Sequence, residues 1–318
     1  MHRRGLLALS ALGVPALARA QARSVRVVVP YAPGGGIDIS ARIFSEALTP
    51  MLGESWLVEN RSGANGAVGS AVVARADPDG RTLLCNSDSH LLARGVMKQV
   101  PYDPVADFTP IGRLAVSPLV LVGAPGLAPR DLPALVADIR ANPDRHAFAN
   151  TSLGTSGHLA TEVFRLETGV PLLIVSYRGT GPALQDVVGG QTSLMMAPLV
   201  SALSLIQTGR LLAYCVTGPG RAAVAPEIPN AAEVGMPALA PIAPWFALWG
   251  PKGLPAAQVA RIHAAAQQAA TTPEVRRKLA DLGGDPIIGE SPEAFAALIT
   301  QATARGLSVL ARAGVQPE

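Results

Sequence analysis

The sequence has 318 residues, a formal net charge of +3, and 26 Lys and Arg residues against 23 Asp and Glu. Three of the arginines fall within the first 20 residues, which contain no acid, so the rest of the chain is formally neutral. A neutral chain lacks the positive charge with which proteins bind nucleic acid or anionic membranes, so neither partner is expected. The remaining length is sufficient for two lobes, each with its own core.

Residues 1–20 have the pattern of a secretory signal peptide. Two arginines precede an apolar run over residues 5–17, and Ala18 and Ala20 supply the small residues that signal peptidase reads. The apolar run is too short to span a membrane, and no later segment is expected to be long and apolar enough. We therefore expect cleavage after Ala20 and export of a soluble protein.

The segment Val25–Ser40 carries the strongest local signal. A run of β-branched residues ends at Pro30, three glycines follow at 34–36, and helical periodicity begins at Asp38. This pattern predicts a strand, a glycine turn and a helix. Glycines let the backbone approach a ligand and a helix start leaves N–H groups unpaired, so the turn is suited to an anion. A purely structural glycine turn is the alternative.

The residues after the glycines indicate the kind of anion. The segment has neither the Gly-Lys-Ser/Thr ending of a P-loop nor a G-x-G-x-x-G pattern, because Ile37 and Asp38 follow Gly36. Asp38 repels a phosphate unless it turns away to cap the helix, so a carboxylate ligand is favoured. We expect a capping role for Asp38, with a general base as the alternative.

The chain then alternates strands and helices in two similar units. Each predicted strand ends in a short polar loop, and parallel strands share one carboxyl edge, so we expect the loops to meet at one cleft. In the first unit the strands cover 56–60 and 82–85 around a helix at 70–75. In the second unit the strands cover 119–122, 146–150, 172–177, 193–197 and 211–217, and the helices cover 132–141, the segment from His158 onward, and 183–188.

The predicted fold class is α/β, with two lobes that are each a mostly parallel sheet flanked by helices and with the ligand cleft between them. We expect the first lobe at 21–121 and the second at 122–218. Residues 219–318 then return to the first lobe. They comprise a proline-rich surface connection at 219–244, a strand at 246–249, and helices at 255–270, 273–282 and 292–313.

Cysteine and histidine residues give no sign of a metal site. Cys85 and Cys215 lie in apolar strand-like runs, and two buried free thiols are expected, with a disulfide between them as the alternative. The histidines are scattered without metal-ligand spacing. We expect no metal and no cofactor.

The segment GTSGH around Ser156 superficially matches the G-x-S-x-G pattern of hydrolases, so a secreted serine hydrolase is one alternative. The hydrolase turn places its serine directly after a strand, and His158 is poorly placed as the base for Ser156, so no catalytic residue is expected. The segment is better suited to donating hydroxyl and N–H groups at a helix start, with His158 as a cap or a ligand contact. Arg178, after Tyr177 at a strand end, is suited equally to clamping a carboxylate or to solvation.

Seven motifs run in order over essentially all of the chain after residue 20: VVVPYAPGGGID, VENRSGANGAVG, PDGRTLL, PYDPVADFTPI, NTSLGTSGHLATEVF, VSYRGTGPALQDVVGGQ and PEVRRKLADLG. Together they closely resemble the extracytoplasmic solute receptors of tripartite tricarboxylate transporters, the Bug-type receptors. The resemblance implies a periplasmic binding protein of two hinged lobes that closes on a small organic acid and delivers it to membrane transporter subunits. We expect a monomer. A receptor that presents its closed form to a sensor protein in signalling has the same features.

In receptors of this kind, the loops resembling Tyr31–Asp38 and Ser152–His158 face each other and hold the carboxylate of the ligand. The chain departs from the usual pattern at Ile37, Ser62 and Gly157. In addition, Ala197-Pro198 replaces a frequent Asp-Asn pair. This replacement removes polar groups from the edge of the second lobe, which favours a more apolar acid.

From the motifs and the resemblance we predict a binding site that does not change its ligand chemically. Main-chain N–H groups and hydroxyls bind the anion, and neighbouring side chains shape the pocket. The predicted ligand-binding residues are Tyr31, Pro33, Gly34, Gly35, Gly36, Asp38, Asn65, Gly66, Ser87, Ser89, Ser152, Thr155, Ser156, His158, Tyr177 and Arg178.

Overall fold

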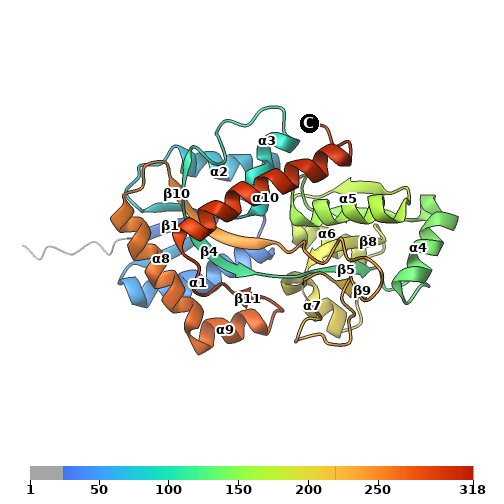
Figure 1. Cartoon of the computed structure of the whole chain (residues 1–318). Coiled ribbons are helices and arrows are strands. Elements are labelled where there is room, and N and C mark those ends of the chain that lie inside the picture. Colours follow the sequence, from blue (N-terminus) through green and yellow to red (C-terminus); the bar gives the residue numbers. More distant parts are fainter. Residues whose placement is uncertain (1–23, 219, 318) are drawn as a thin grey trace, which may run out of the picture.

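The computed structural model describes residues 24–218 and 220–317, so the predicted signal peptide at 1–20 lies outside the described residues. Two β-sheets, each covered by helices on both faces, form two lobes that lie side by side (Figure 1). Each lobe therefore has three layers, with the sheet in the middle.

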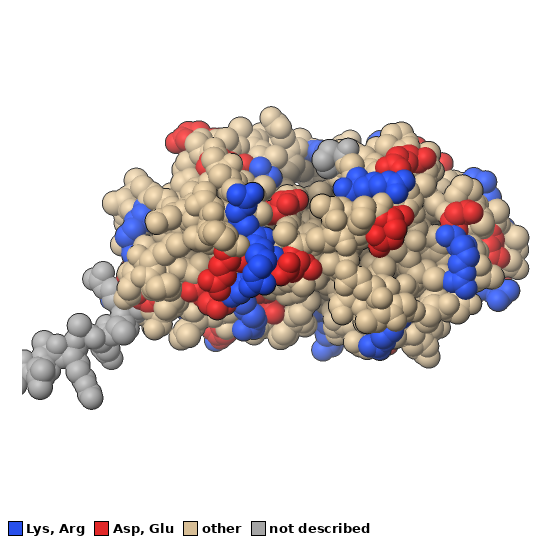
Figure 2. All heavy atoms as spheres, turned by 90° about the horizontal axis from the view of Figure 1, so that it is seen from below, with Lys and Arg blue, Asp and Glu red and all other residues tan. Residues whose placement is uncertain are grey.

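Charged side chains of both signs are interspersed on the face shown in Figure 2. Ion pairs join some of the charged side chains of the described surface. Lys278, for example, lies 2.8 Å from Glu46 and 2.9 Å from Glu274, and Arg277 lies 3.0 Å from Asp281. The mixture of both signs on this side matches the formally neutral composition of residues 21–318.

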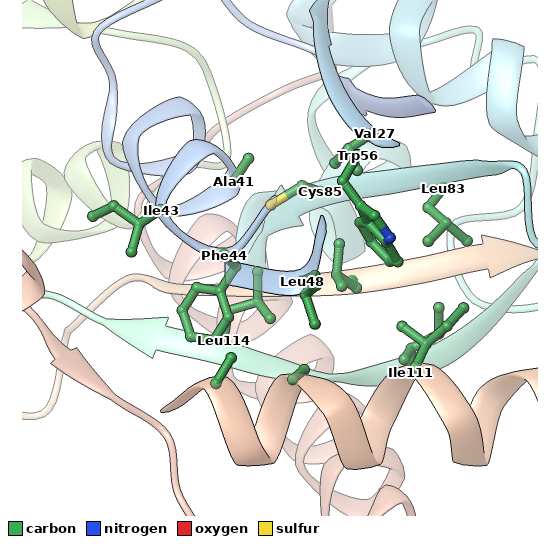
Figure 3. Packing of buried hydrophobic residues seen from close by; sticks show 14 of the residues in the cluster. Val27, Ala41, Ile43, Phe44, Leu48, Trp56, Leu83, Cys85, Ile111 and Leu114 are labelled. Carbon is green, nitrogen blue, oxygen red and sulfur yellow. The ribbon is translucent and has the colours of Figure 1, made fainter. Parts of the chain in front are cut away.

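The first lobe is built on a six-stranded sheet whose residues alternate between two cores. Val27 packs with helices α1, α8 and α9 on one face, and Val28 packs with α2 and α10 on the other. Figure 3 shows part of the first core, in which Phe44 and Leu48 of α1 lie near strand residues. The strands, in sheet order, are β11 (Asp285–Pro286), β4 (Phe108–Val116), β10 (Trp245–Pro251), β3 (Thr82–Ser87), β1 (Ser24–Val29) and β2 (Ser55–Asn60). The helices are α1 (Gly36–Leu52), the 3₁₀ turn η1 (Ala64–Gly66), α2 (Ala67–Ala74), the 3₁₀ turn η2 (Asp88–Leu92), α3 (Ala93–Val96), α8 (Ala256–Thr271), α9 (Pro273–Ala280) and α10 (Pro292–Arg312).

The second lobe repeats this arrangement on a five-stranded sheet. Leu121 faces a core with α4 and α5, and its neighbour Val122 faces a core with α6 and α7. The strands, in sheet order, are β7 (Leu173–Ser176), β6 (Ala147–Asn150), β8 (Leu194–Pro198), β5 (Leu119–Gly123) and β9 (Leu212–Val216). The helices are α4 (Leu132–Ala141), the 3₁₀ turn η3 (Pro143–Arg145), α5 (Ser156–Thr168), α6 (Thr180–Val188) and α7 (Leu199–Gln207).

Both sheets are mixed rather than mostly parallel. In the first lobe β2, β1 and β3 are parallel, whereas β10 is antiparallel to β3 and β4. In the second lobe β7, β6 and β8 are parallel, whereas β5 is antiparallel to β8 and β9. The antiparallel strands β10 and β5 are those by which the chain enters each lobe from the other. A buried apolar strand has the same sequence pattern in either direction, so the sequence did not reveal this.

The chain passes between the lobes at two strand connections and along α10. Ser117 and Pro118 join β4 to β5, just before the predicted lobe boundary at residue 121, and residues 217–244 join β9 to β10. Helix α10 packs on the first lobe and extends to α5 of the second (Figure 1). There, Nη2 of Arg165 donates a hydrogen bond to the carbonyl oxygen of Ala313 at 2.9 Å.

The predicted surface connection at 219–244 is instead partly core. Among its described residues, Ile228, Met236 and Leu239 are buried in the two cores of the second lobe. The many prolines correctly predicted irregular backbone in this segment. The apolar residues between these prolines nevertheless pack into the cores of the second lobe. Irregular backbone is thus compatible with a buried position here.

Helix α10 corrects the expectation that no later segment is long and apolar enough to span a membrane. Its 21 residues meet that description by length and composition. Phe295, Ile299 and Leu310 of this helix are buried against the rest of the chain. These three side chains pack against the two lobes, whereas Leu307 of the same helix is exposed.

The two cysteines are buried free thiols, as predicted. Cys85 lies in a core of the first lobe and Cys215 in a core of the second. Burial raises the pKa of both thiols. Both cysteines therefore serve as small apolar core residues.

Candidate functional site

The ends of strands from both lobes meet at a small cavity of about 60 Å³. Loops after β1 and β3 line it from the first lobe, and loops after β6, β7 and β8 line it from the second. The cavity is therefore where the sheet topology predicts a ligand, at the carboxyl ends of parallel strands. Its lining residues are Tyr31, Ala32, Gly35, Gly36, Ile37, Asp38, Ser87, Leu119, Thr151, Thr155, Ser156, Gly157, Gly179, Thr180, Met196, Pro198, Pro244 and Phe246.

The start of α1 supplies main-chain donors to this cavity. Gly35 is the N-cap residue, and its carbonyl accepts the first helical bond, from the N–H of Ile39 at 3.0 Å. Among the described residues, no acceptor pairs with the N–H groups of Gly36, Ile37 or Asp38. These are the orphan donors of a helix start, and they carry its partial positive charge.

Glycine is required at position 36 by an aromatic ring. A Cβ atom there would lie 2.5 Å from Cζ of Phe246, so any side chain would displace the ring. Phe246 belongs to a core of the first lobe and also forms one wall of the cavity. The glycine turn and β10 are therefore in close contact beside the cavity.

The side chain of Asp38 turns away from the helix axis, as predicted. It accepts a hydrogen bond from Gly34, the residue before the N-cap residue Gly35, rather than from an N–H group within the helix. Its carboxylate accepts hydrogen bonds from the N–H of Gly34 at 3.0 Å, from Nε of Arg42 at 3.1 Å and from Nδ2 of Asn60 at 2.9 Å. Burial alone would raise the pKa of Asp38, but the bonds from Arg42, Gly34 and Asn60 outweigh burial and lower it. The fully paired carboxylate holds the turn in shape and is unsuited to act as a base.

The start of α5 faces the cavity from the second lobe. Oγ1 of the N-cap residue Thr155 accepts a hydrogen bond from the N–H of His158 at 3.2 Å. The N–H groups of Ser156 and Gly157 have no acceptor among the described residues. A second helix start thus directs donors at the space into which α1 points.

The start of α6 completes the donor set. Gly179 is its N-cap residue, makes no side-chain cap, and lines the cavity together with Thr180. A Cβ atom at Gly35 would lie 3.5 Å from Oγ1 of Thr180, and one at Gly179 would lie 3.2 Å from Cβ of Ala32. The lobes are therefore in close contact here, and three helix starts surround one small volume.

The remaining walls of the cavity are apolar and carry no basic side chain. Met196, Pro198, Leu119 and Phe246 line it, and neither Lys nor Arg is among its described lining residues. An anion in this cavity is therefore held by dipoles and N–H groups rather than by a counter-charge.

Half of the predicted site residues line or support this cavity. Ser89 supports the wall, since its Oγ lies 3.2 Å from Oη of Tyr31 and 2.7 Å from Oγ of Ser87. Burial raises the pKa of Tyr31 to about 12, so its hydroxyl stays protonated as a hydrogen-bonding group. The residues of this group are Tyr31, Gly35, Gly36, Asp38, Ser87, Ser89, Thr155 and Ser156.

A second cavity between the lobes, of about 630 Å³, shares Tyr31 with the first. It lies towards β2 and β7, the edge strands farthest from the connections between the lobes, and so forms the outer part of the cleft. Nδ2 of Asn65 donates across it to the carbonyl oxygen of Leu153 at 2.8 Å. Five predicted site residues line this outer cavity instead: Asn65, Gly66, Ser152, Tyr177 and Arg178.

Three predicted residues line neither cavity. Pro33 and Gly34 sit at the lip of the turn, where the carbonyl of Gly34 accepts from Oγ of Ser201 at 3.3 Å. His158 is buried, and its Nδ1 accepts from the N–H of Gly154 at 3.1 Å. Its Nε2 lies 3.7 Å from Oε1 of Glu162. The ring of His158 thus braces the start of α5 from behind.

Sequence reasoning missed two kinds of residue. Thr151, Gly179 and Thr180 lie in the loops that were predicted to converge, and the Gly-Thr-Gly-Pro stretch after Arg178 was a usable helix-start signal. Asp88, between two predicted residues, accepts a hydrogen bond from Oγ of Ser156 in the opposite lobe. That pairing joins residues 68 positions apart and had no local signal.

Comparison with known proteins identifies the family. Residues 40–315 match the model of the tripartite tricarboxylate transporter family receptor. The chain belongs to this family. It is 34% identical to Protein BugT of Bordetella pertussis over 297 residues, which cover 93% of this chain and 90% of BugT. The family resemblance inferred from the sequence motifs is thereby confirmed.

Solved structures support the same conclusion. The structure of the periplasmic binding protein BugD matches with a TM-score of 0.89 and 32% identity, covering 93% of this chain and 99% of that one. Rpa4515 of R. palustris with adipate matches with a TM-score of 0.90 and 30% identity, covering 94% and 100%. The two-lobed periplasmic-binding-protein fold is confirmed, and this family comprises solute-binding receptors rather than enzymes.

Proposed function

We propose that this tripartite tricarboxylate transporter receptor captures a small organic carboxylate between its lobes and delivers it, chemically unchanged, to membrane transporter subunits. The observation that carries the proposal is the convergence of the starts of α1, α5 and α6 on one cavity. Orphan N–H groups at helix starts bind anions, and here they come from both lobes.

A carboxylate suits this cavity better than a phosphate. The cavity is small and has no Lys or Arg among its described lining residues, whereas a doubly charged phosphate usually requires a counter-charge. The carboxylate of Asp38 also lies at its edge, although its charge is taken up by Arg42 and Asn60. A singly charged carboxylate head fits this balance of donors and charge.

The rest of the ligand extends along apolar walls toward the outer cavity. Phe246, Met196 and Pro198 suit a hydrocarbon chain, and Pro198 belongs to the Ala-Pro pair that replaces polar residues usual in the family. At the outer cavity, Asn65 and Arg178 contact the remote end of the ligand. The adipate bound to Rpa4515, a chain of methylene groups between two carboxylates, illustrates the class of compound.

Closure of the lobes on the ligand forms the surface that a membrane partner recognises. The connections at 117–118 and 217–244 act as the hinge, because all parallel strand ends lie on the cleft side of them. The signal peptide at 1–20 directs the chain to the periplasm. The description of its relative BugD as a periplasmic binding protein supports this location. Presentation of the closed form to a sensor protein is the rival role.

A thermal-shift survey of mono-, di- and tricarboxylic acids tests the proposal. We expect at least one acid to raise the melting temperature in a concentration-dependent manner, since a ligand that binds only the folded state stabilises it. Native mass spectrometry of freshly purified protein should show the same class of acid as a co-purified mass. If no acid shifts the melting temperature and none co-purifies, the proposal is wrong.

A further inference from the structure

One hydrogen bond joins the two lobes directly beside the ligand cavity. Asp88 is the first residue of η2, immediately after β3 in the first lobe, and its Oδ2 accepts from Oγ of Ser156. Ser156 is the first residue of α5 in the second lobe, is buried, and lines the cavity. The partner of Asp88 is thus itself a residue of the anion-binding helix start.

The carboxylate of Asp88 lies between the two lobes, in a residue that is half-buried as a whole. Its Oδ1 is buried and has no hydrogen-bond partner among the described residues. Burial raises the pKa of Asp88 to about 6, although the hydrogen bond from Ser156 opposes the rise. Separation of the lobes would remove the bond from Ser156 and open one side of Asp88 to water.

The charged neighbours of Asp88 leave its charge uncompensated. On its own element the nearest titratable residue is His90, whose pKa burial lowers to about 3, so its ring is neutral. Tyr31 from the β1 side is protonated, and α5 contributes the buried pair of His158 and Glu162.

Basic side chains on β4 and α10 line a further cavity that Asp88 also lines. Nη2 of Arg113 lies 2.6 Å from Oε1 of its partner Glu290, and Arg305 donates to the carbonyl of Pro241. Arg312 and Glu167 complete the charged residues of that cavity. Within the described ranges, no ion pair includes Asp88.

We propose that Asp88 couples ligand binding to lobe closure: it positions Ser156 at the anion site and takes up a proton from solvent when the lobes close on the ligand. This inference rests on the proposed carboxylate-binding function. The carboxylate of the ligand adds a second negative charge beside Asp88, which favours the protonated acid further.

The direction of the pH dependence follows from linkage. In the open form Asp88 is more solvated, so its pKa lies nearer the ordinary aspartate value of about 3.9 than it does in the closed form. The closed form therefore binds the proton more tightly. Affinity for the ligand should rise as the pH falls through about 6, and it should be independent of Asp88 titration above about pH 7.5.

Isothermal titration calorimetry with the acid that gives the largest thermal shift tests this inference. Titrations between pH 5 and 8, in two buffers of different ionisation enthalpy, measure both affinity and the number of protons taken up. We expect wild-type protein to take up a fraction of a proton per ligand near pH 6, with affinity rising up to about tenfold per pH unit below that. Asp88→Asn should bind at least as tightly as wild type at pH 7.5 and lose this proton uptake.

Three further variants make the test specific. Ser156→Ala should weaken binding and shift proton uptake to higher pH, because it removes a hydrogen bond that favours the ionised acid. Asp88→Ala should bind more weakly than Asp88→Asn, because alanine cannot position Ser156. Asp77→Asn, at an exposed turn, should match wild type in both affinity and proton uptake.

Equal proton uptake in wild type and Asp88→Asn would overturn the inference while leaving the carboxylate-binding function intact. Absence of binding by every acid in every variant would overturn both.

Discussion

At the scale of single residues, the site depends on positions where the chain has no side chain. Gly35 has φ −82° and ψ 163°, a conformation open to any residue, so backbone strain does not require glycine there. What alanine would change is space, because its Cβ would enter the gap between the lobes near Thr180. Gly35 and Gly36 are thus kept free for contacts with the opposite lobe and with Phe246.

We expect Gly35→Ala to lower affinity for the carboxylate about tenfold with little change in thermal stability, because the added methyl group takes up space in the small cavity that Gly35 lines. Calorimetric titration and thermal unfolding measure the two quantities. Gly126→Ala is the matched control, since a Cβ at that exposed glycine meets nothing within 4 Å. An unchanged affinity in Gly35→Ala would show that the ligand does not occupy the space beside Gly35.

The lowered pKa of Asp38 predicts how the free energy of unfolding depends on pH. Because its pKa is lowered in the folded protein, its stabilisation is present at neutral pH and is lost as the pH falls through the folded pKa. Asp38→Asn should cost about 1 to 3 kcal/mol at pH 7, and the difference from wild type should shrink toward pH 3. Urea unfolding at both pH values measures this, and a difference that grows on acidification would contradict the assignment.

At the scale of elements, the sequence predicted most strands and helices because their apolar periodicities are strong. The helix predicted at 132–141 agrees with the structure. The sequence missed β4, which contains Pro110 and Gly112, and α7, which follows directly on β8 without a turn signal. It also placed the start of α1 at Asp38, two residues late, because Gly36 and Ile37 give no helical signal of their own.

The residues of the candidate site that lie at helix starts could be predicted from the sequence. The contacts between residues of opposite lobes could not. Thr155 and Ser156 follow a β-strand and open an amphipathic helix, so local rules located them. The division of predicted residues into an inner and an outer cavity depends on the order of strands in each sheet. No local pattern encodes that order, and the contact between Asp88 and Ser156 depends on it.

The N-caps of two helices allow the role of α5 to be separated from general stability. Thr155→Ala removes the acceptor for the N–H of His158 and should cost about 1 kcal/mol of stability while also weakening ligand binding. Ser291→Ala removes the equivalent N-cap bond of α10, to the N–H of Ala294, and should cost a similar amount. Binding by Ser291→Ala should stay at the wild-type level. Equal effects of both variants on affinity would mean that α5 acts only through stability.

At the scale of the whole molecule, two separately packed lobes meet through polar contacts at the cleft and through α10 behind it. Ala64 and Asn65 adopt the left-handed conformation, with φ of 42° and 51°, where Asn65 reaches the carbonyl of Leu153. This strained turn and its bond span the outer cavity between the lobes. The bond should therefore slow ligand release more than it affects ligand capture.

We expect Asn65→Gly to increase the dissociation rate constant about fivefold and leave the association rate constant nearly unchanged, since one hydrogen bond of about 1 kcal/mol is lost only from the closed form. Glycine adopts the left-handed backbone without strain, so the fold is retained. Stopped-flow measurement separates the two rate constants. Asn142→Gly, which removes a bond to Asp138 far from the cleft, is the control. A change confined to the association rate constant would contradict this role.

The central claim is that amide groups at the starts of three helices bind the carboxylate. Titration of ¹⁵N-glycine-labelled protein with the acid that gives the largest thermal shift tests it by NMR. We expect saturable shifts, with one common dissociation constant, at the amides of Gly36, Gly157 and Gly181 and none at the remote Gly126. Saturable binding that leaves the amides of Gly36, Gly157 and Gly181 unshifted would contradict the claim.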